Sequence, residues 1–484
     1  MNLEKIKNVH IIGIGGIGIS AIAKMMLKLG KKVSGSDINS SEIIKDLKNR
    51  GVKIYLKHKK ENLSADVDLI IYSSAVSKNN PELLQAKKLQ ATRLALRAKR
   101  VCLCSPCFAG EADKLTYSYF EFLGELSKEK FTVAVSGTNG KSTTTSMLGL
   151  ILEAAKTDPI IIVGSKVNQP TWEENFRMGS GNYFVVEACE YQANMLNLYP
   201  QIIVLTNIEE DHLDYYKDIN DIKKTFQKYI EKLPQNGILI ANIDDKNIKL
   251  ILKKIKKPKF EIFTFGQSKK ADYQIKNIIK KPGLIKFTIE YNKIGEKFVL
   301  QVPGLFNIYN ATAAIIVAVK INASLNVIKK VLKNFKGIWR RFEKVGEKNG
   351  AIIISDYAHT PTAIQGTIQA AKDFYPNRRI VVAFQPHHRD RTKKLFNDFV
   401  KSFDCVDYLI LSEIFDVAGR EDKKNKNISS NDLVQVIKKR LAFKNKQVLY
   451  AKDLNETKKL ILKNLEPNDL ILLIGAGDIY KTKL

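Results

Sequence analysis

The sequence predicts an α/β protein of three domains: a Rossmann-like N-terminal domain, a central P-loop domain with a mostly parallel sheet, and a Rossmann-like C-terminal domain. Three observations support this. The 484 residues are enough for two to four domains, each with its own core. Strand patterns alternate with helical patterns along the chain, as in parallel sheets. Glycine turns follow strands near residues 12, 136 and 474. We place the domains at residues 1–127, 128–336 and 337–484.

Composition narrows the class of protein. The hydrophobic content of 44% indicates a globular chain, and no apolar run reaches the ~20 residues of a membrane span. The chain begins with a strand pattern and not a signal peptide, so we expect a cytoplasmic protein. The net charge is +29, but lysine is spread along the whole chain. An even distribution favours a general bias of the organism toward lysine over a basic surface that binds nucleic acid. Weak binding of polyanions stays an alternative. The five cysteines, an odd number, argue against a disulfide framework.

The first motif is a strand, a glycine turn and a helix at residues 9–37. Gly13-Ile-Gly15-Gly16-Ile-Gly18 is a full G-x-G-x-x-G, and Asp37 follows Gly18 by 19 residues. This spacing lets a diphosphate approach the backbone and lets Asp37 accept a hydrogen bond from a ribose or base. NAD and a UDP-sugar both fit, and a purely structural turn is the alternative. The residues expected at this site, including those at the end of a later strand, are Gly15, Gly16, Ile17, Ser36, Asp37, Ser73 and Ser74.

Residues 93–114 differ in amino-acid composition from the segments around them. Arginines cluster there although the chain elsewhere prefers lysine, and three of the five cysteines lie there. We predict an insertion or irregular segment, to which we assign no function, followed by a helix at residues 118–126.

The second glycine turn, at residues 131–144, follows a β-branched strand pattern and opens a helix. Gly137 and Gly140 are closer together than the general P-loop consensus requires, so this is a variant P-loop. Lys141 is expected to reach the β- and γ-phosphates, and Ser142 to hold Mg²⁺. The alternative is a glycine turn capped by hydroxyl groups. The predicted phosphate-binding residues are Gly137, Thr138, Asn139, Gly140, Lys141, Ser142 and Thr143.

Acidic residues follow the next two strand patterns. Glu187 ends one strand, where P-loop proteins place a carboxylate on the Mg²⁺ side. His212 lies in an acid-rich loop after the second strand and is a candidate for a second metal or substrate contact. The alternatives are a surface acid and a charged surface loop.

Apolar and polar residues alternate in short runs at residues 269–302, which predicts a small antiparallel insert. An alanine-rich helix follows, and its first turn holds Phe306, Asn307 and Asn310. Phe306 could stack on a base while one of the asparagines binds its edge; helix capping by Asn307 is the alternative.

The third region repeats strands that end in polar loops. Arg340 and Arg341 stand together before its first strand and suit an anionic group. The loops after two strands hold further candidates, namely Asp356 and His359 in the first and His387 and Arg391 in the second. Polar side chains at the carboxyl ends of parallel strands meet at one edge of a sheet.

Taken together, these motifs resemble the Mur ligase family of peptidoglycan synthesis. They occur in family order over nearly the whole chain, and only residues 93–114 look foreign. The motifs that carry the resemblance are His10-Ile-Ile-Gly-Ile-Gly-Gly-Ile-Gly, Ser34-Gly-Ser-Asp37, Gly137-Thr-Asn-Gly-Lys-Ser-Thr-Thr-Thr, Thr206-Asn-Ile-Glu-Glu-Asp-His, Arg340-Arg-Phe-Glu, Asp356-Tyr-Ala-His and Phe384-Gln-Pro-His.

The resemblance implies a division of labour. The first domain would hold the UDP of UDP-N-acetylmuramate, the second would bind ATP, and the third would hold the amino acid and part of the ATP site. ATP would convert the lactyl carboxylate to an acyl phosphate, which the amine of L-alanine attacks. The cofactors implied are ATP and Mg²⁺, or Mn²⁺ in its place, and we expect a monomer or weak dimer that binds no nucleic acid.

The resemblance also implies roles for single residues. Lys141, Asp356, His359 and Arg391 match catalytic positions. Other matches are Ser142, Glu187 and His212 to metal positions, Asn307, Asn310, Arg340 and Arg341 to the ATP site, and His387 and Arg391 to the loop for the amino-acid carboxylate.

Departures from the family pattern leave alternatives open. Asn139, Phe306 and Thr360 replace histidines, and His388 stands where an arginine is usual, which leaves Arg391 as the carboxylate anchor. A sister ligase that joins another amino acid or a preformed peptide to the same nucleotide therefore stays an alternative. More distant alternatives are an NAD(P)-binding oxidoreductase fused to a P-loop module and a non-catalytic nucleotide-binding regulator.

Overall fold

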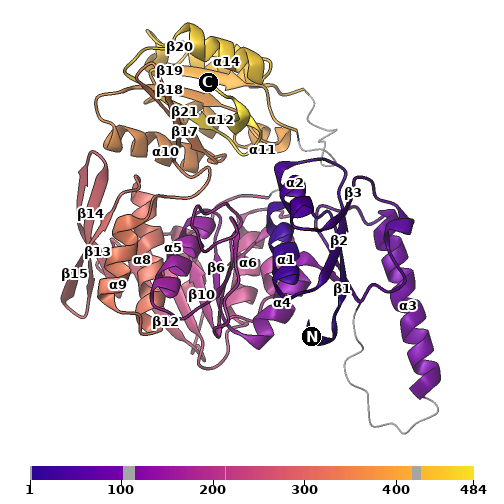
Figure 1. Cartoon of the computed structure of the whole chain (residues 1–484). Helices are drawn as coiled ribbons and strands as arrows, with labels where there is room; N and C mark the ends of the chain where they lie inside the picture. Colours follow the sequence, from indigo (N-terminus) through magenta and orange to yellow (C-terminus); the bar gives the residue numbers. More distant parts are fainter. Residues whose placement is uncertain (1–2, 102–114, 213, 417–426) are drawn as a thin grey trace.

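A computed structural model describes residues 3–101, 115–212, 214–416 and 427–484. It contains three separate sheets, each with helices packed on it (Figure 1). This confirms the predicted three-domain α/β fold. Among the described residues, no helix has both the length and the apolar composition needed to cross a membrane.

The first sheet is entirely parallel, with the strand order β3-β2-β1-β4-β5. Its central strand β1 is almost completely buried and runs directly into the first glycine turn. The elements are β1 Asn8–Ile12, α1 Ile17–Lys28, β2 Lys32–Ser36, α2 Glu42–Asn49, β3 Lys53–Tyr55, β4 Leu69–Tyr72, α3 Pro81–Val101, β5 Thr116–Ser118 and α4 Tyr119–Glu129, with 3₁₀ segments Leu3–Lys5 and Lys60–Asn62.

The prediction of an irregular segment from residue 93 is wrong for its first part. Helix α3 continues to Val101, because residues 81–101 contain no internal proline or glycine and are rich in alanine, leucine and lysine. The rest of the proposed insertion, with Cys102, Cys104 and Cys107, lies outside the described residues. The helix expected at 118–126 is α4, which Ser118 and Glu121 begin with a capping box.

The central sheet has ten strands in the order β15-β14-β13-β12-β11-β10-β6-β9-β7-β8. β6, at its middle, leads into the P-loop and helix α5. The elements are β6 Phe131–Ser136, α5 Lys141–Ala154, β7 Ile160–Ile162, β8 Phe176–Arg177, β9 Tyr183–Ala188, β10 Ile202–Leu205, α6 Ile219–Ile230, β11 Ile238–Asn242, α7 Lys246–Leu252, β12 Glu261–Gly266, β13 Tyr273–Lys281, β14 Leu284–Tyr291, β15 Ile294–Leu300, α8 Leu305–Lys320 and α9 Leu325–Asn334, with the 3₁₀ segment Tyr191–Asn197.

The antiparallel pairing predicted for residues 269–302 is confirmed. β13, β14 and β15 pair antiparallel, and β13 continues the central sheet by pairing parallel with β12. These strands therefore extend the edge of the central sheet, and in Figure 1 they reach toward α10 of the third domain.

The third sheet has the order β16-β17-β21-β18-β19-β20 and is parallel except for β16. The elements are β16 Glu343–Lys348, β17 Ala351–Asp356, α10 Pro361–Phe374, β18 Arg379–Phe384, α11 Arg389–Lys394, α12 Phe396–Lys401, β19 Tyr408–Ser412, α13 Ser430–Lys438, β20 Gln447–Ala451, α14 Leu454–Lys463 and β21 Asp469–Ile474, with 3₁₀ segments Leu441–Phe443 and Ile479–Lys481.

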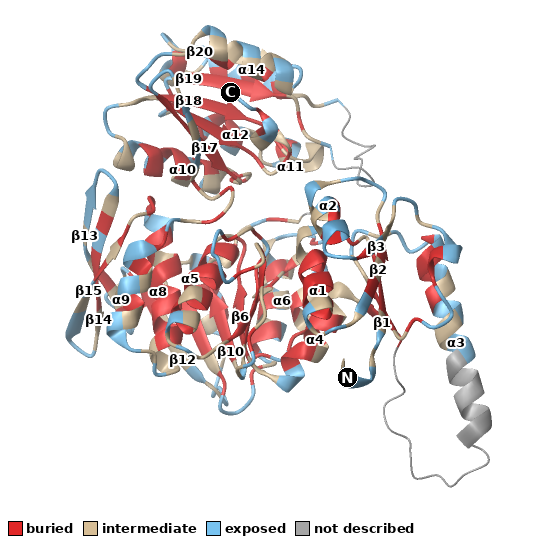
Figure 2. Ribbon diagram, in the orientation of Figure 1, coloured by how far each residue is buried: buried red, intermediate tan, exposed pale blue. Residues whose placement is uncertain are grey.

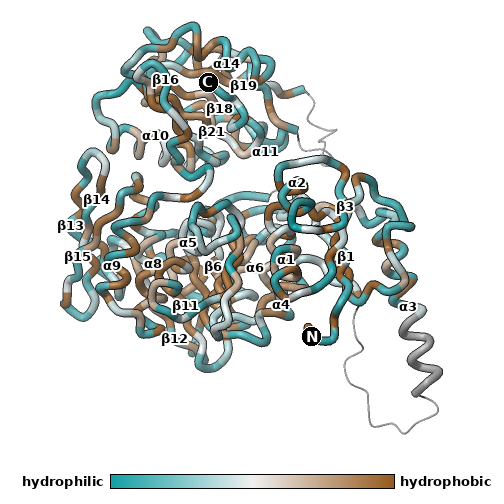
Figure 3. The backbone as a smooth tube through the Cα atoms, viewed as in Figure 1, coloured by the Kyte–Doolittle hydropathy of each residue, from teal (hydrophilic) through white to brown (hydrophobic). Residues whose placement is uncertain are grey.

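The cores of the three domains are not equally independent. Buried residues concentrate on the strands and on the helices that pack against them (Figure 2), and much of the same backbone carries hydrophobic residues (Figure 3). One buried cluster runs without interruption from the first domain, through Met25 and Phe122, into the central domain at Phe184 and Phe226. The two clusters of the third domain contain only residues from Phe342 onward. Among the described residues, the first two domains thus share extensive apolar packing, which the third domain joins only at its first residues, where Ile338 packs in the central core.

Candidate active site

Two cavities meet at the P-loop. The larger, of about 450 Å³, lies between the central and third domains. The smaller, of about 300 Å³, extends from the P-loop toward the first domain, where Ile17 lines it. The residues that line both are Asn139, Gly140, Ser142, Arg341 and His359. A ligand in the larger cavity can therefore meet a ligand in the smaller one beside the P-loop.

The P-loop backbone depends on its two glycines. Gly137 has φ +131° and Gly140 has φ +88°, a region that favours glycine. A Cβ at Gly140 would collide with the Asn310 side chain, and one at Gly137 with Thr206. Helix α5 begins directly after Gly140, so its free N–H groups face the cavities. The loop is thus a tight, preformed anion cradle.

Lys141 is the cation of this cradle. Its Nζ lies 2.8 Å from Oε2 of Glu190 and donates to the carbonyl oxygens of Gly137 (2.5 Å) and Thr138 (3.1 Å). Burial alone would lower the pKa of Lys141, but the Glu190 carboxylate outweighs it and raises the pKa. The side chain therefore stays charged, as binding to phosphate requires.

Ser142 and Glu187 form a pair suited to a divalent cation. The Ser142 hydroxyl donates to Oε2 of Glu187 over 3.1 Å, and the Gly164 amide donates to Oε1. Burial raises the pKa of Glu187 because it destabilises the charged carboxylate. A cation bound beside the carboxylate would stabilise that charged form. A hydroxyl and a carboxylate at a P-loop fit the oxygen preference of Mg²⁺.

His212, the other expected metal residue, lies beside Glu190 and not beside Glu187. Its Nε2 is 3.8 Å from Oε1 of Glu190, and its ring is 4.6 Å from that of Tyr191. Among the described residues, no three His, Cys, Asp or Glu side chains form a ready cation cluster. His212 is thus separated from the Ser142–Glu187 pair by the Lys141–Glu190 ion pair.

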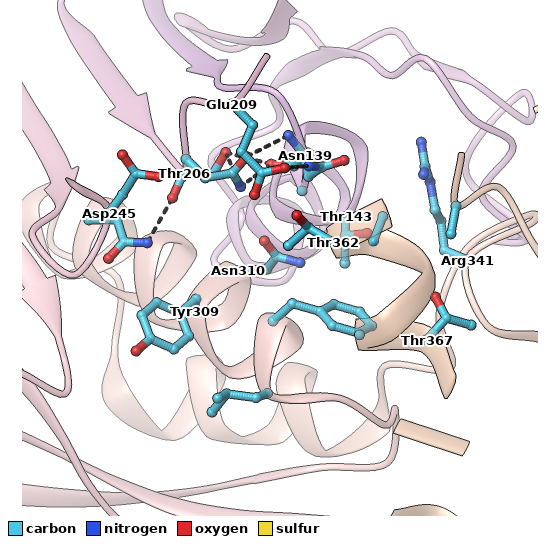
Figure 4. A pocket seen from close by; sticks show the side chains of 18 of the residues that line it. Asn139, Thr143, Thr206, Glu209, Asp245, Tyr309, Asn310, Arg341, Thr362 and Thr367 are labelled. Atoms are coloured by element: carbon cyan, nitrogen blue, oxygen red, sulfur yellow. Dashed lines mark hydrogen bonds between the residues drawn. The ribbon is translucent and has the colours of Figure 1, made fainter. Parts of the chain in front are cut away.

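The base-side residues lie at the start of α8. Asn310 lines the larger cavity with Phe306 and Tyr309, opposite Thr362 and α10 (Figure 4). Asn307 is buried; its amide donates to the Pro303 carbonyl over 2.7 Å and its oxygen accepts from Asn310 over 3.1 Å. Gly304, and not Asn307, is the N-cap of α8. The arrangement leaves Asn310 to face a ligand and Asn307 to orient it.

Asp356 is the last residue of β17, and His359 lies in the loop that follows. The Asp356 carboxylate accepts from the amides of Phe342 (2.7 Å) and Ala358 (2.8 Å), so it shapes the loop, and it also lines the larger cavity. Burial raises its pKa. Burial lowers the pKa of His359 despite the nearby Asp211, whose Oδ2 is 3.6 Å from Nε2.

His387 lies in the loop after β18, and Arg391 lies on helix α11, which begins directly after that loop. The His387 ring stacks on Phe415 at 5.7 Å, and burial lowers its pKa to about 2, so it is neutral. Arg391 Nη1 lies 3.5 Å from His387 Nδ1, while Nη2 donates to the Asp211 carboxylate. The structure therefore brings both predicted residues together and ties them to the central domain.

The two neighbouring arginines are placed differently. Arg340 is buried; it donates to the carbonyl oxygens of Gly475 and Gly477 and lies among the rings of Trp339, Tyr357 and Tyr480. Arg341 lines both cavities (Figure 4). The structure thus places Arg341 in both cavities, while Arg340 lines only the smaller one and uses Nη2 of its guanidinium inside the third domain.

The predicted UDP site is only partly exposed. The Gly15 amide donates to Asp37 over 2.9 Å, which closes the glycine turn at the start of α1. Ser36 is buried, 2.9 Å from His58 Nδ1, and donates to Glu82, so its hydroxyl is used within the domain. Of the predicted residues, only Ser36 is buried; the others remain at least partly accessible, namely Gly15, Gly16, Ile17, Asp37, Ser73 and Ser74.

Sequence reasoning did not select several residues that line these cavities. Glu190 and Asp211 each form an ion pair with a predicted residue, and Glu209, Asp244 and Tyr309 line the larger cavity. Each stands within three residues of a predicted residue or strand end, which is the signal that could have found them.

Comparisons of the sequence and of the structure with known proteins all match Mur ligases, over nearly the whole chain. Three family models match it: "Mur ligase family, catalytic domain" at residues 8–98, "Mur ligase middle domain" at 135–318 and "Mur ligase, glutamate ligase domain" at 340–477. The chain is 39% identical to the UDP-N-acetylmuramate–L-alanine ligase of Caldanaerobacter subterraneus subsp. tengcongensis and 42% identical to that of Clostridium tetani, covering 99% of this chain and 97% of each relative. A solved UDP-N-acetylmuramate–alanine ligase from Thermotoga maritima superposes with a TM-score of 0.76 at 26% identity, covering 99% of this chain and 97% of that one.

Proposed function

The chain belongs to the Mur ligase family, and from that premise we propose that it joins L-alanine to the lactyl carboxylate of UDP-N-acetylmuramate at the expense of ATP. The relatives that carry this name match the chain over almost its full length. The observation that carries the proposal is that the P-loop lies between two adjoining cavities, one at the third domain and one toward the first.

ATP fits the larger cavity. Its triphosphate would lie on the P-loop and the N-terminus of α5, and its base between Phe306, Tyr309 and the end of β12. Lys141 would neutralise the γ-phosphate, and Arg341 would stabilise the charge from the opposite side. When bound at Ser142 and Glu187, Mg²⁺ would supply further neutralisation of the phosphate oxygens.

The acid substrate would enter from the first domain. Its diphosphate would lie at the Gly15–Ile17 turn, and its lactyl carboxylate would extend into the smaller cavity beside Lys141. An oxygen of that carboxylate forms a bond to the γ-phosphorus while the bond to ADP breaks. The product is an acyl phosphate, and the protein contributes mainly position and charge.

The amino acid would be held by the third domain. The Arg391 guanidinium is suited to its carboxylate, with His387 beside it. The amine then attacks the acyl carbon, phosphate leaves, and the amine loses a proton. His359 lines both cavities, and its imidazole, whose pKa is lowered by burial, would accept that proton. We also propose that the reaction takes place in the cytoplasm, because it consumes ATP.

The test is phosphate release from ATP in the presence of Mg²⁺. We expect release only when UDP-N-acetylmuramate and an amino acid are both present. L-Alanine, glycine, L-serine and the preformed peptide are compared in parallel, with L-alanine expected to be fastest. Release that does not depend on UDP-N-acetylmuramate would refute the proposal, and a preference for the peptide would assign the chain to the sister activity.

A further inference from the structure

The third domain reaches the P-loop through polar contacts. Its apolar clusters include no residue of the other domains. Among the described contacts, Lys280 pairs with Asp373 over 2.7 Å at the edge strands, and Ser165 donates to the Trp339 carbonyl at the connection between domains. Neither pair lies within the segments that carry His359 and Arg391. Near His359, Glu209 of the central domain also forms a hydrogen bond with Thr362 at the start of α10, and a further contact reaches both His359 and Arg391.

Asp211 provides that contact. It follows β10 in the central domain, and its side chain is 6% exposed. Its carboxylate accepts from the Arg391 guanidinium, and Oδ2 lies 3.6 Å from His359 Nε2. The backbone amide of His212 donates to Oδ1 over 2.7 Å, which fixes the direction of the carboxylate.

The two partners of Asp211 come from different segments of the third domain. His359 lies in the loop after β17 and Arg391 on helix α11 after β18, and these two strands are separated by β21 in the sheet. One buried carboxylate therefore orients both segments that are expected to hold and activate the amino acid. A buried ion pair with fixed geometry contributes to specificity of position even when its net contribution to stability is small.

We propose that Asp211 is a positioning residue that sets where the amino acid is held relative to the P-loop. It does so by holding Arg391 and His359 of the third domain against the central domain. The inference rests on the ligase function proposed above and deepens it. A competing role predicts the opposite change in the KM for the amino acid. If Asp211 only occupies the place of the substrate carboxylate at Arg391, it competes with the amino acid, and its removal would tighten amino-acid binding.

The experiment compares Asp211→Asn and Asp211→Glu with Glu210→Gln. Glu210 is the exposed neighbour in the same loop and serves as the matched control. Wild type is assayed first; if it does not ligate, the proposed function fails and not this inference. In Asp211→Asn we expect the KM for the amino acid to rise by about 10-fold or more and kcat to fall, because one partner of a buried charge pair is lost. Asp211→Glu should recover part of both, and Glu210→Gln should match wild type.

Three outcomes would overturn the proposal. The KM for UDP-N-acetylmuramate and the Mg²⁺ concentration for half-maximal rate should stay near wild type; a rise in the Mg²⁺ requirement would mean that Asp211 acts through His212. A lower KM for the amino acid would establish the placeholder role. An Asp211→Asn enzyme with wild-type constants would show that the contact has no role.

A double-mutant cycle provides a second route if Asp211→Asn folds poorly. Arg391→Lys keeps the charge but loses the planar guanidinium. In the proposed role, the effects of Asp211→Glu and Arg391→Lys on the KM for the amino acid are not additive, because the two residues form one unit. Additive effects would overturn the coupling.

Discussion

The Lys141 ammonium lies 2.8 Å from the Glu190 carboxylate, in the wall of the smaller cavity beside the P-loop. The sequence predicted the lysine as a phosphate contact but not its partner. Glu190 keeps Lys141 charged and aims it across the P-loop. The γ-phosphate would compete with Glu190 for the same ammonium. The ion pair therefore orients Lys141 before ATP binds and can be replaced when the phosphate arrives.

Lys141→Ala should abolish turnover and leave binding of UDP-N-acetylmuramate intact. We expect a loss of at least about 10²-fold in kcat, because a charged donor to the transferring phosphoryl group is removed. The control is Lys224→Ala, an exposed lysine of the same domain. Activity is measured by phosphate release and nucleotide binding by calorimetry. Loss of UDP-N-acetylmuramate binding in a folded variant would contradict the division of labour between the domains.

Glu187→Gln should raise the Mg²⁺ requirement. The amide keeps the size of the side chain but removes the charge that faces Ser142. We expect the Mg²⁺ concentration for half-maximal rate to rise on the order of 10- to 100-fold. The measurement is a Mg²⁺ titration at fixed ATP. A larger effect in His212→Ala than in Glu187→Gln would move the main cation site to the Glu190 side.

Phe306→Ala should weaken ATP binding selectively. Phe306 is 39% exposed and lines the larger cavity beside Tyr309, so its ring is available to a base. Loss of one stacking partner should raise the KM for ATP roughly tenfold. The KM for the amino acid should not change. Leu325→Ala, a similarly exposed apolar residue on α9, is the control; an equal effect there would refute a stacking role.

Local patterns in the sequence predicted most of the fold. The strand, glycine turn and helix around the P-loop are set by residues next to each other in the chain, and β6 and α5 occur where they were expected. Residues 93–101 were expected to be irregular because of their clustered arginines, although their helix propensity is high and α3 continues to Val101.

The candidate site was less predictable because its pairs are distant in sequence. Arg391 and Asp211 are 180 residues apart, and Lys141 and Glu190 are 49 apart. Arg340 is a further example, since its burial depends on three aromatic rings that only the folded chain brings together. A motif predicted that these residues matter, but not which of them faces a ligand.

Glu82→Gln should destabilise the first domain in a pH-dependent manner. Burial alone would raise the pKa of Glu82, but hydrogen bonds from His10, Ser36 and Asn62 outweigh it and lower the pKa. A lowered pKa in the folded state stabilises the fold above the unfolded pKa of about 4.3 and loses that effect as the pH falls below it. The loss at pH 7 should be about 2–3 kcal/mol, because a fully buried partner is removed.

The measurement is the thermal midpoint at several pH values from 7 to 3.5. The gap between wild type and Glu82→Gln should be widest at pH 7 and narrow below about pH 4.5. Glu61→Gln, at an exposed neighbouring glutamate, is the control. A gap that stays constant with pH would show that the charge of Glu82 does not matter.

Arg340→Lys and Arg341→Lys should separate stability from catalysis. Arg340 is 4% exposed and donates to two backbone carbonyl oxygens from inside an aromatic cage. Lysine cannot reproduce that planar fork, so we expect a loss of about 2–4 kcal/mol in the stability of the third domain. Arg341 lines both cavities, and its lysine variant should keep wild-type stability while kcat falls roughly tenfold or more. Thermal unfolding and steady-state kinetics of the two purified variants decide the matter: a stable Arg340→Lys enzyme with a raised KM for ATP would place that guanidinium at the nucleotide after all.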